Sequence, residues 1–143
     1  MILGLGIDLV DVPRIEAALA RGERLVNRLF TPAEVAYCRG HREPARHFAA
    51  RFAAKEAGMK ALGTGWSGGV GWRNFEVTLD PRGRPLLHVT GRAGEIARSL
   101  GATHALLSLA HDGGLATAVV ALEGESAAGF HARWGRTPIG EPE

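Results

Sequence analysis

The chain has 143 residues, a formal net charge of +2 and a pI near 9.2. This length suits one domain that buries about two-thirds of the surface of the unfolded chain. The single cysteine, Cys38, has no nucleophile pattern around it and indicates a reducing compartment. No run of eighteen apolar residues occurs and the N-terminus does not resemble a signal peptide, so we expect a cytoplasmic protein without a membrane segment. The mild basicity, without a lysine cluster or interleaved aromatics, argues against nucleic acid binding.

The first predicted element is a buried strand over residues 2–10, whose alternating glycines let another backbone come close. Asp8 is the one charge in this strand. A carboxylate in such an apolar strand needs an ion partner, hydrogen bonds or a metal. Asp11 is better placed to cap the next helix, over residues 14–19, so we expect a functional role for Asp8.

Arginines recur through the next segment. Arg14, Arg21 and Arg28 are seven residues apart, with Arg24 between them. If the helix continues through Gly22, they form one basic stripe. Such a stripe is either a solvated face or a dock for an acidic partner.

Two further helices follow. A capping box at residues 31–34 begins a short helix over residues 32–39. A polar linker leads to a long helix over residues 45–62, bounded by Pro44 and Gly63. The chain's only lysines, Lys55 and Lys60, lie in this helix, whereas all fifteen other basic residues are arginine. A compact ammonium group suits a compact anion such as phosphate, with chance as the rival interpretation.

Glu56 and Lys60 are four residues apart on the long helix, beside a strip of small residues. They form either an ordinary surface ion pair or part of a site. The loop Gly63-Thr64-Gly65, which follows directly, has unhindered backbone N–H groups that can wrap a phosphate and favours the site.

The second half of the chain is rich in strands. A glycine-rich loop precedes a hairpin, with strands over residues 75–79 and 85–89 and a turn at residues 80–83. A helix over residues 92–100 and two apolar strands, residues 104–110 and 115–122, complete an α+β fold. We expect residues 124–143 to form an irregular extension.

Asp8 and Glu56 are the candidate metal ligands, because Mg²⁺ needs only one or two protein carboxylates when substrate phosphate and water complete its shell. Ser108, His111 and Asp112 lie too close in the chain for a hydrolytic triad, and no G-x-S-x-G turn is present. No His or Cys spacing suits zinc.

Five segments carry a resemblance to a known family: GLGIDLVDVPRIE, FTPAEVAYC, RFAAKEAGMKALGTG, FEVTLDPRGRPLL and LSLAHDGGLATAVV. In this order, over residues 1–123, the chain resembles the bacterial holo-[acyl-carrier-protein] synthases. The resemblance implies a 4'-phosphopantetheinyl transferase-like domain, with an antiparallel-rich sheet packed on one long helix and shorter helices. It also implies transfer of 4'-phosphopantetheine from coenzyme A to a serine of apo acyl carrier protein, with release of 3',5'-ADP, in fatty acid biosynthesis.

The family's roles extend to matching positions here. Asp8 and Glu56 would hold Mg²⁺, and Lys60 would neutralise phosphate charge beside them. His111 would lie near the coenzyme, and either it or a carboxylate acting through metal-bound water would be the general base. The rest of the coenzyme site would comprise Arg51, Gly63, Thr64, Gly65, Gly83, Arg84 and Pro85, and the carrier protein would dock on Arg14, Arg21, Arg24 and Arg28. The family also implies a homotrimer with active sites between subunits.

The chain departs from the family pattern at Ala110, where a serine is usual, and at Asn74, where an aspartate is usual. The first departure puts one hydrogen bond near the coenzyme in doubt. Two rival functions remain open from the residues: a module that binds coenzyme A or a carrier protein without turnover, and a Mg²⁺-dependent pyrophosphate hydrolase. Whether the carrier serves fatty acids or polyketides is open as well.

Overall fold

A computed structural model describes residues 1–125 and 136–140. The elements are β1 (Ile2–Asp11), α1 (Val12–Leu19), α2 (Glu23–Leu29), α3 (Pro32–Arg39), α4 (Pro44–Leu62), the 3₁₀ helix η1 (Trp72–Asn74), β2 (Phe75–Leu79), β3 (Pro85–Val89), α5 (Gly91–Ser99), β4 (Ala102–Asp112), β5 (Leu115–Gly124) and β6 (Arg136–Pro138). The predicted α+β class is confirmed.

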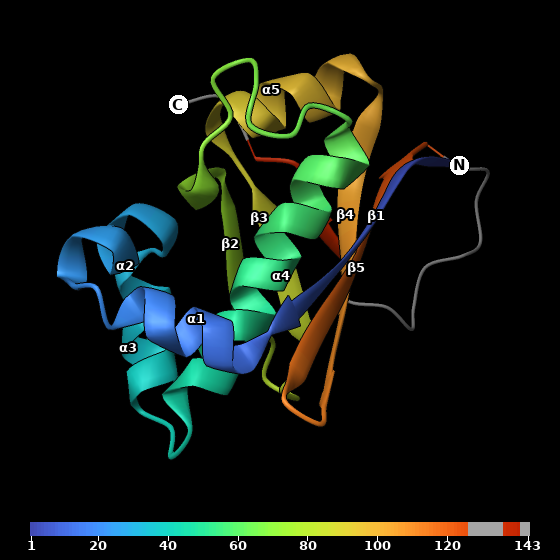
Figure 1. The fold of residues 1–143 in the computed structure, drawn as a ribbon. Helices are drawn as coiled ribbons and strands as arrows, with labels where there is room; N and C mark the ends of the chain where they lie inside the picture. The colour runs from blue at the N-terminus through green and yellow to red at the C-terminus, as the bar shows by residue number, and fades with distance from the viewer. Residues whose placement is uncertain (126–135, 141–143) are drawn as a thin grey trace.

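The long helix α4 lies between two antiparallel sheets (Figure 1). One sheet has the strand order β1-β5-β4-β6, and the other is the β2-β3 hairpin. Most of α4 is therefore buried, including Phe48, Met59 and Leu62. In the part of the chain described, no helix is long and apolar enough to span a membrane.

Helix α4 touches β1 almost backbone to backbone. A Cβ added to Gly4 would lie 2.1 Å from the carbonyl oxygen of Ala61, and one added to Gly6 would lie 1.9 Å from that of Ala57. Neither distance leaves room for a side chain. The close approach predicted from the alternating glycines is confirmed, and the alanine strip of α4 (Ala49, Ala53 and Ala57) is fully buried.

The structure differs from expectation around Gly22. This residue has φ of 134°, a conformation that disfavours side chains, so α1 ends at Leu19 and α2 is a separate helix. The four arginines therefore do not form one helical stripe. Asp11 is at the N-cap of α1 as predicted, although its side chain makes no capping hydrogen bond.

The C-terminal extension is not irregular where it is described. Arg136–Pro138 form β6, which pairs with β4, and Ile139 is buried beside it. This pairing gives β4, otherwise an edge strand, a hydrogen-bonded neighbour. Local sequence patterns could not indicate that β4 and β6 pair. Residues 126–135 and 141–143 lie outside the described part, and the division of the chain after residue 123 stays a prediction.

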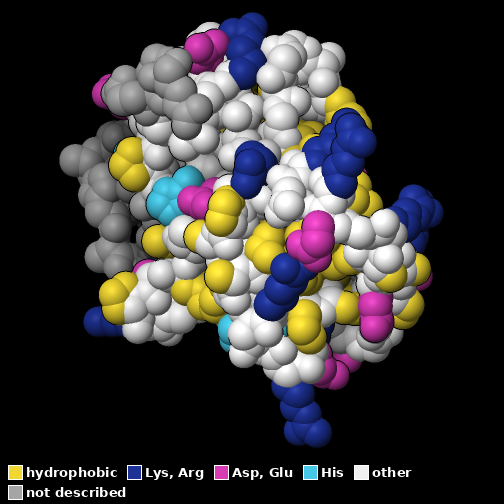
Figure 2. Space-filling view, turned by 90° about the vertical axis from the view of Figure 1, so that its left-hand side faces the viewer, with side chains coloured by type: hydrophobic (Ala, Val, Ile, Leu, Met, Phe, Trp, Pro, Cys, Tyr) yellow, Lys and Arg dark blue, Asp and Glu magenta, His cyan; other side chains and the backbone are white. Residues whose placement is uncertain are grey.

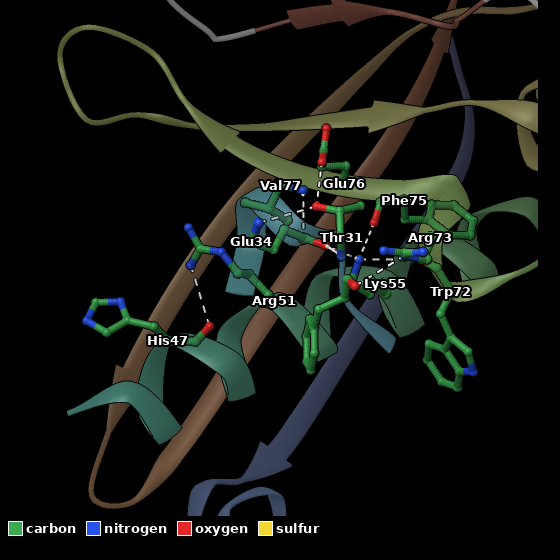
Figure 3. Close-up of polar contacts among 11 residues, drawn as sticks. Thr31, Glu34, His47, Arg51, Lys55, Trp72, Arg73, Phe75, Glu76 and Val77 are labelled. Carbon is green, nitrogen blue, oxygen red and sulfur yellow. Dashed lines mark hydrogen bonds and ion pairs between the residues drawn. The ribbon is translucent and has the colours of Figure 1, made fainter. Parts of the chain in front are cut away.

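A buried polar network holds the other side of α4 (Figure 3). The Lys55 ammonium group donates to Glu34 Oε1 at 2.7 Å, to the Trp72 carbonyl oxygen at 3.3 Å and to the Phe75 carbonyl oxygen. Glu34 also accepts hydrogen bonds from the backbone N–H groups of Thr31 and Val77, both at 3.0 Å. These contacts join α3, α4, η1 and β2.

Lys55 therefore has a structural role. The hypothesis that the lysines of this helix face a phosphate is wrong for Lys55. Its side chain and that of Glu34 are fully buried. Burial lowers the pKa of Lys55, and the Glu34 carboxylate partly opposes this effect. Glu34 serves both the predicted capping box and this ion pair, a second role that the capping pattern does not reveal.

We predict that Gly6→Ala destabilises the protein by about 3 kcal/mol, the upper end of the usual cost of overpacking. The new methyl group would displace β1 from α4. Urea unfolding checks this prediction. Gly40→Ala is the matched control, since Gly40 has φ of −74° and an added Cβ would have no neighbour closer than 3.4 Å. Equal stability of Gly6→Ala and the wild type would contradict the close approach.

We predict that Lys55→Met lowers the free energy of unfolding by about 3–5 kcal/mol, because it leaves the Glu34 carboxylate buried and unpaired. Adding Glu34→Gln should recover part of the loss, as a double-mutant cycle from urea unfolding will show. The control is Glu95→Ala, which removes a half-exposed ion pair with Arg92 and should cost less than about 1 kcal/mol. If the losses in unfolding free energy of the two single variants add up to that of the double variant, Lys55 and Glu34 are not coupled.

Candidate active site

Asp8 projects from the inward face of β1. Along this strand Gly6, Asp8 and Val10 are buried, whereas Leu5, Ile7 and Leu9 alternate with them and are exposed. The Asp8 carboxylate is thus held against α4, and the Thr117 hydroxyl on β5 donates to the Asp8 carbonyl oxygen at 2.7 Å. The close contact between β1 and α4 brings Asp8 to the long helix.

Glu56 and Lys60, one turn apart on α4, face Asp8. The Lys60 ammonium group lies 3.1 Å from Asp8 Oδ1 and 3.0 Å from the Ile7 carbonyl oxygen. The pKa of Glu56 is raised to about 7, first by its partial burial and then by the neighbouring Asp8 carboxylate, which competes for the same proton. The positive charges of Lys60 and Arg14 oppose this shift. Two acids distant in the sequence therefore meet, with a lysine beside them.

This arrangement fits a divalent cation. Asp8 Oδ2 is buried and has no hydrogen-bond partner among the described residues. An unpartnered carboxylate oxygen beside a second carboxylate suits a hard cation such as Mg²⁺, which takes few protein ligands and completes its shell with water and phosphate oxygens. Within the described ranges, no group of three or more His, Cys, Asp or Glu side chains could hold a metal.

The predicted phosphate loop begins where α4 ends. Gly63 closes the helix in the left-handed conformation with φ of 76°, and Gly65 also has positive φ, at 56°. The loop is tightened by Ser67, whose backbone N–H and hydroxyl both donate to the Thr64 carbonyl oxygen. It begins one turn beyond Lys60, so the two acids, the lysine and the start of the loop lie on one side of α4.

The other predicted coenzyme residues lie elsewhere. His111 is at the β4-β5 turn, where its Nδ1 is 3.5 Å from an Arg46 guanidinium nitrogen in the first turn of α4. Glu56 is ten residues further along α4, a rise of about 15 Å. Within one chain His111 is therefore separated from the two acids. Gly83 and Arg84 lie in the hairpin turn and Pro85 begins β3. In this turn Asp80 Oδ1 accepts from the backbone N–H groups of Arg82 and Arg84, each at 2.8 Å.

Beside His111 the surface opens into a cleft of about 980 Å³. It is lined by α1, the linker from α3 to α4 and the β4-β5 turn, and its basic side chains are Arg39, Arg42, Arg46 and His111. We did not predict these arginines as site residues. The run of basic residues between the two helices was the available signal, but we interpreted it as a polar linker.

Arg51 is also not at the acidic centre. Its side chain is buried, its guanidinium carbon lies 4.1 Å from the centre of the Tyr37 ring, and Nη1 lies 3.5 Å from the His47 carbonyl oxygen (Figure 3). Cys38 is likewise buried, which raises the pKa of its thiol to about 11. A thiol with this pKa is protonated at neutral pH, as expected for a residue without a catalytic role.

The arginines proposed for carrier docking are exposed on two helices, Arg14 on α1 and Arg24 and Arg28 on α2, with Arg21 in the connection. Figure 2 shows the face that carries α2 and α3, where basic side chains are scattered among acidic and hydrophobic ones. Arg14 is the member of the set whose charge acts on Glu56. A docking residue predicted from periodicity thus lies near the acidic centre.

Several known proteins are similar to this chain in both sequence and fold. Residues 4–120 match the 4'-phosphopantetheinyl transferase superfamily. A holo-[acyl-carrier-protein] synthase of Koribacter versatilis is 51% identical over 124 residues, which cover 86% of this chain and 99% of the relative. The crystal structure of the Neisseria meningitidis synthase has a TM-score of 0.78 and 32% identity over 86% of this chain and 99% of that chain.

A second structural match is the Helicobacter pylori synthase, crystallised in complex with coenzyme A, with a TM-score of 0.73 and 28% identity over 83% of this chain and 99% of that chain. The matched superfamily region contains both acids, the lysine and the loop described above. The chain belongs to the holo-[acyl-carrier-protein] synthases of the 4'-phosphopantetheinyl transferase superfamily.

Proposed function

We propose that this chain transfers the 4'-phosphopantetheine of coenzyme A to a serine hydroxyl of an apo acyl carrier protein and releases 3',5'-ADP. Membership of the family supports this type of reaction. The observation that carries the site is the meeting of Asp8, Glu56 and Lys60 between β1 and α4.

In this proposal Asp8 and Glu56 would hold Mg²⁺, which would neutralise charge on the pyrophosphate of coenzyme A. When bound, the ion neutralises phosphate charge and polarises the phosphorus that is attacked. The Lys60 side chain is more than half exposed, so its ammonium group is able to turn from Asp8 toward a phosphate oxygen. The unhindered N–H groups of residues 63–65 suit a second phosphate contact.

The carrier's serine oxygen attacks the β-phosphorus, and the bond from this phosphorus to the bridging oxygen breaks. The bridging oxygen leaves on 3',5'-ADP with the electron pair of the broken bond, and the serine proton passes to a general base. Little covalent help is needed in such a displacement, so positioning and charge neutralisation suffice. His111 of the same copy contacts Arg46 in the first turn of α4, ten residues before Glu56, which favours His111 of another copy or a carboxylate as the base.

We also propose that the chain works as a homotrimer with sites between copies. The outward face of β1 supports this assembly, because Leu5, Ile7 and Leu9 are each more than 60% exposed in one contiguous row. Apolar rows of this kind mark interaction surfaces. Another copy could place its His111 and the arginine-lined cleft near the acidic centre, where the cleft's cations would suit the nucleotide phosphates of coenzyme A.

Carrier docking remains assigned to Arg14, Arg21, Arg24 and Arg28. Their exposure supports contact with an acidic protein surface, and the effect of the Arg14 charge on Glu56 supports docking close to the acidic centre. Apo acyl carrier protein and coenzyme A are the partners expected in this proposal.

We predict that Asp8→Ala and Glu56→Ala each reduce Mg²⁺-dependent transfer by at least about 100-fold, because a metal ion contributes several kcal/mol of charge stabilisation. The measurement is the mass of an apo carrier protein after incubation with coenzyme A, Mg²⁺ and enzyme. Calorimetric titration with Mg²⁺ should show a parallel loss of binding. Glu95→Ala, which removes a carboxylate from α5, is the control.

The same assay separates the rival functions. A gain of one phosphopantetheine on the carrier supports the transferase, nucleotide products without this gain indicate a hydrolase, and binding without products indicates a non-catalytic module. Near-normal turnover in Asp8→Ala or Glu56→Ala would remove that residue from the proposed metal site.

We predict that Leu5→Glu or Ile7→Glu splits the assembly, because each places a carboxylate in an apolar contact at a cost of several kcal/mol. Sedimentation velocity should show a mass of three copies for the wild type and one for the variants, and transfer activity should fall with the mass. Leu100→Glu, at a half-exposed position next to α5, is the control. A wild-type monomer with full activity would contradict the trimer.

A further inference from the structure

Trp66 is a large apolar side chain exposed beside the acidic centre. It follows the loop Gly63-Thr64-Gly65 directly, and 62% of its surface is open to solvent. Burying an indole is strongly favourable, so an exposed tryptophan held in a fixed place indicates a binding surface.

The ring is held in place by other aromatic side chains. Trp66 meets Trp72 edge to face with ring centres 4.7 Å apart, and Trp72 stacks on Phe52 with ring centres 5.1 Å apart. We call Phe52, Trp66 and Trp72 the aromatic shelf. Trp72 is fixed at its carbonyl oxygen by the buried Lys55 ammonium, and its ring points away from that network (Figure 3).

The segment that carries Trp66 is anchored on both sides of it. The Ser67 hydroxyl, directly after Trp66, donates to the carbonyl oxygen of Thr64, two residues before Trp66, at 2.7 Å. After it, Arg92 of α5 donates through Nε to the Gly68 carbonyl oxygen at 2.9 Å. The tryptophan is therefore presented to solvent by a short braced loop.

The shelf borders the acidic centre through α4. Phe52, Glu56 and Lys60 are spaced four residues apart and form one row along the helix. The chain leaves α4 shortly after Lys60. It then returns along the helix to Phe52, on which Trp72 stacks. Phe52 of the shelf therefore lies one turn of α4, a rise of about 5.4 Å along the helix, from Glu56, which we assign to the metal.

We propose that the aromatic shelf, through Trp66, binds the pantetheine arm of coenzyme A and aligns the phosphorus to which the arm is attached. The inference rests on the proposed transferase function. The arm is uncharged and carries a gem-dimethyl group and two amides, so its methyl groups can pack on the indole face while an amide carbonyl accepts from the indole N–H. The phosphate at the acidic centre and the arm on the shelf are parts of one transferred group.

The experiment compares two ligands by calorimetric titration in the presence of Mg²⁺. One is coenzyme A, and the other is adenosine 3'-phosphate 5'-diphosphate, which keeps the pyrophosphate but lacks the arm. We expect Trp66→Ala to weaken binding of coenzyme A about tenfold and to change binding of the analogue by less than about twofold. Trp66→Phe should restore most of the affinity, and the KM for the carrier protein should not change in either variant.

Ser67→Ala is the matched control, because it loosens the loop and keeps the indole. Equal weakening of both ligands in Trp66→Ala, unchanged affinity for coenzyme A, or a raised KM for the carrier with unchanged coenzyme affinity would each overturn the proposal. The last result would assign Trp66 to the carrier. Failure of the transferase function itself would appear separately, as no phosphopantetheine mass gain with the wild-type enzyme.

Discussion

Strand β1 and helix α4 meet without side chains between them at Gly4 and Gly6, and the acidic centre depends on this contact. Only glycine lets the strand approach the carbonyl groups of the helix so closely. Asp8, two residues after Gly6, is thereby carried against Glu56 and Lys60. A strand displaced by the width of one side chain would separate Asp8 from Glu56 and Lys60.

The opposite side of α4 is held by a buried ion pair. Lys55 precedes Glu56 by one residue, so the contacts of Lys55 with Glu34 and two carbonyl groups also fix the rotation of the helix that carries Glu56. Breaking a buried pair costs far more than breaking a surface pair, because one charge remains without a partner. The two lysines of the chain thus have different duties: Lys55 orients the helix and Lys60 faces the proposed phosphate.

One copy of the chain displays parts of a site that do not converge within it. The acidic centre and the braced loop of Trp66 lie toward the end of α4, whereas His111 and the arginine-lined cleft lie near its beginning. The apolar outer row of β1 gives a physical reason for copies to associate. In our proposals, association brings the two halves together, and the aromatic shelf receives the part of coenzyme A that is transferred.

The sequence by itself determined the class of the fold and the participants in the acidic centre. The period of the strands, the capping box before α3 and the bounds of α4 are local patterns, and a charge within an apolar strand marked Asp8. Only the tertiary structure decided that Lys55 is buried, that Gly22 separates two helices and that Arg136–Pro138 add a strand. These outcomes depend on partners distant in the sequence, which neither periodicity nor composition can identify.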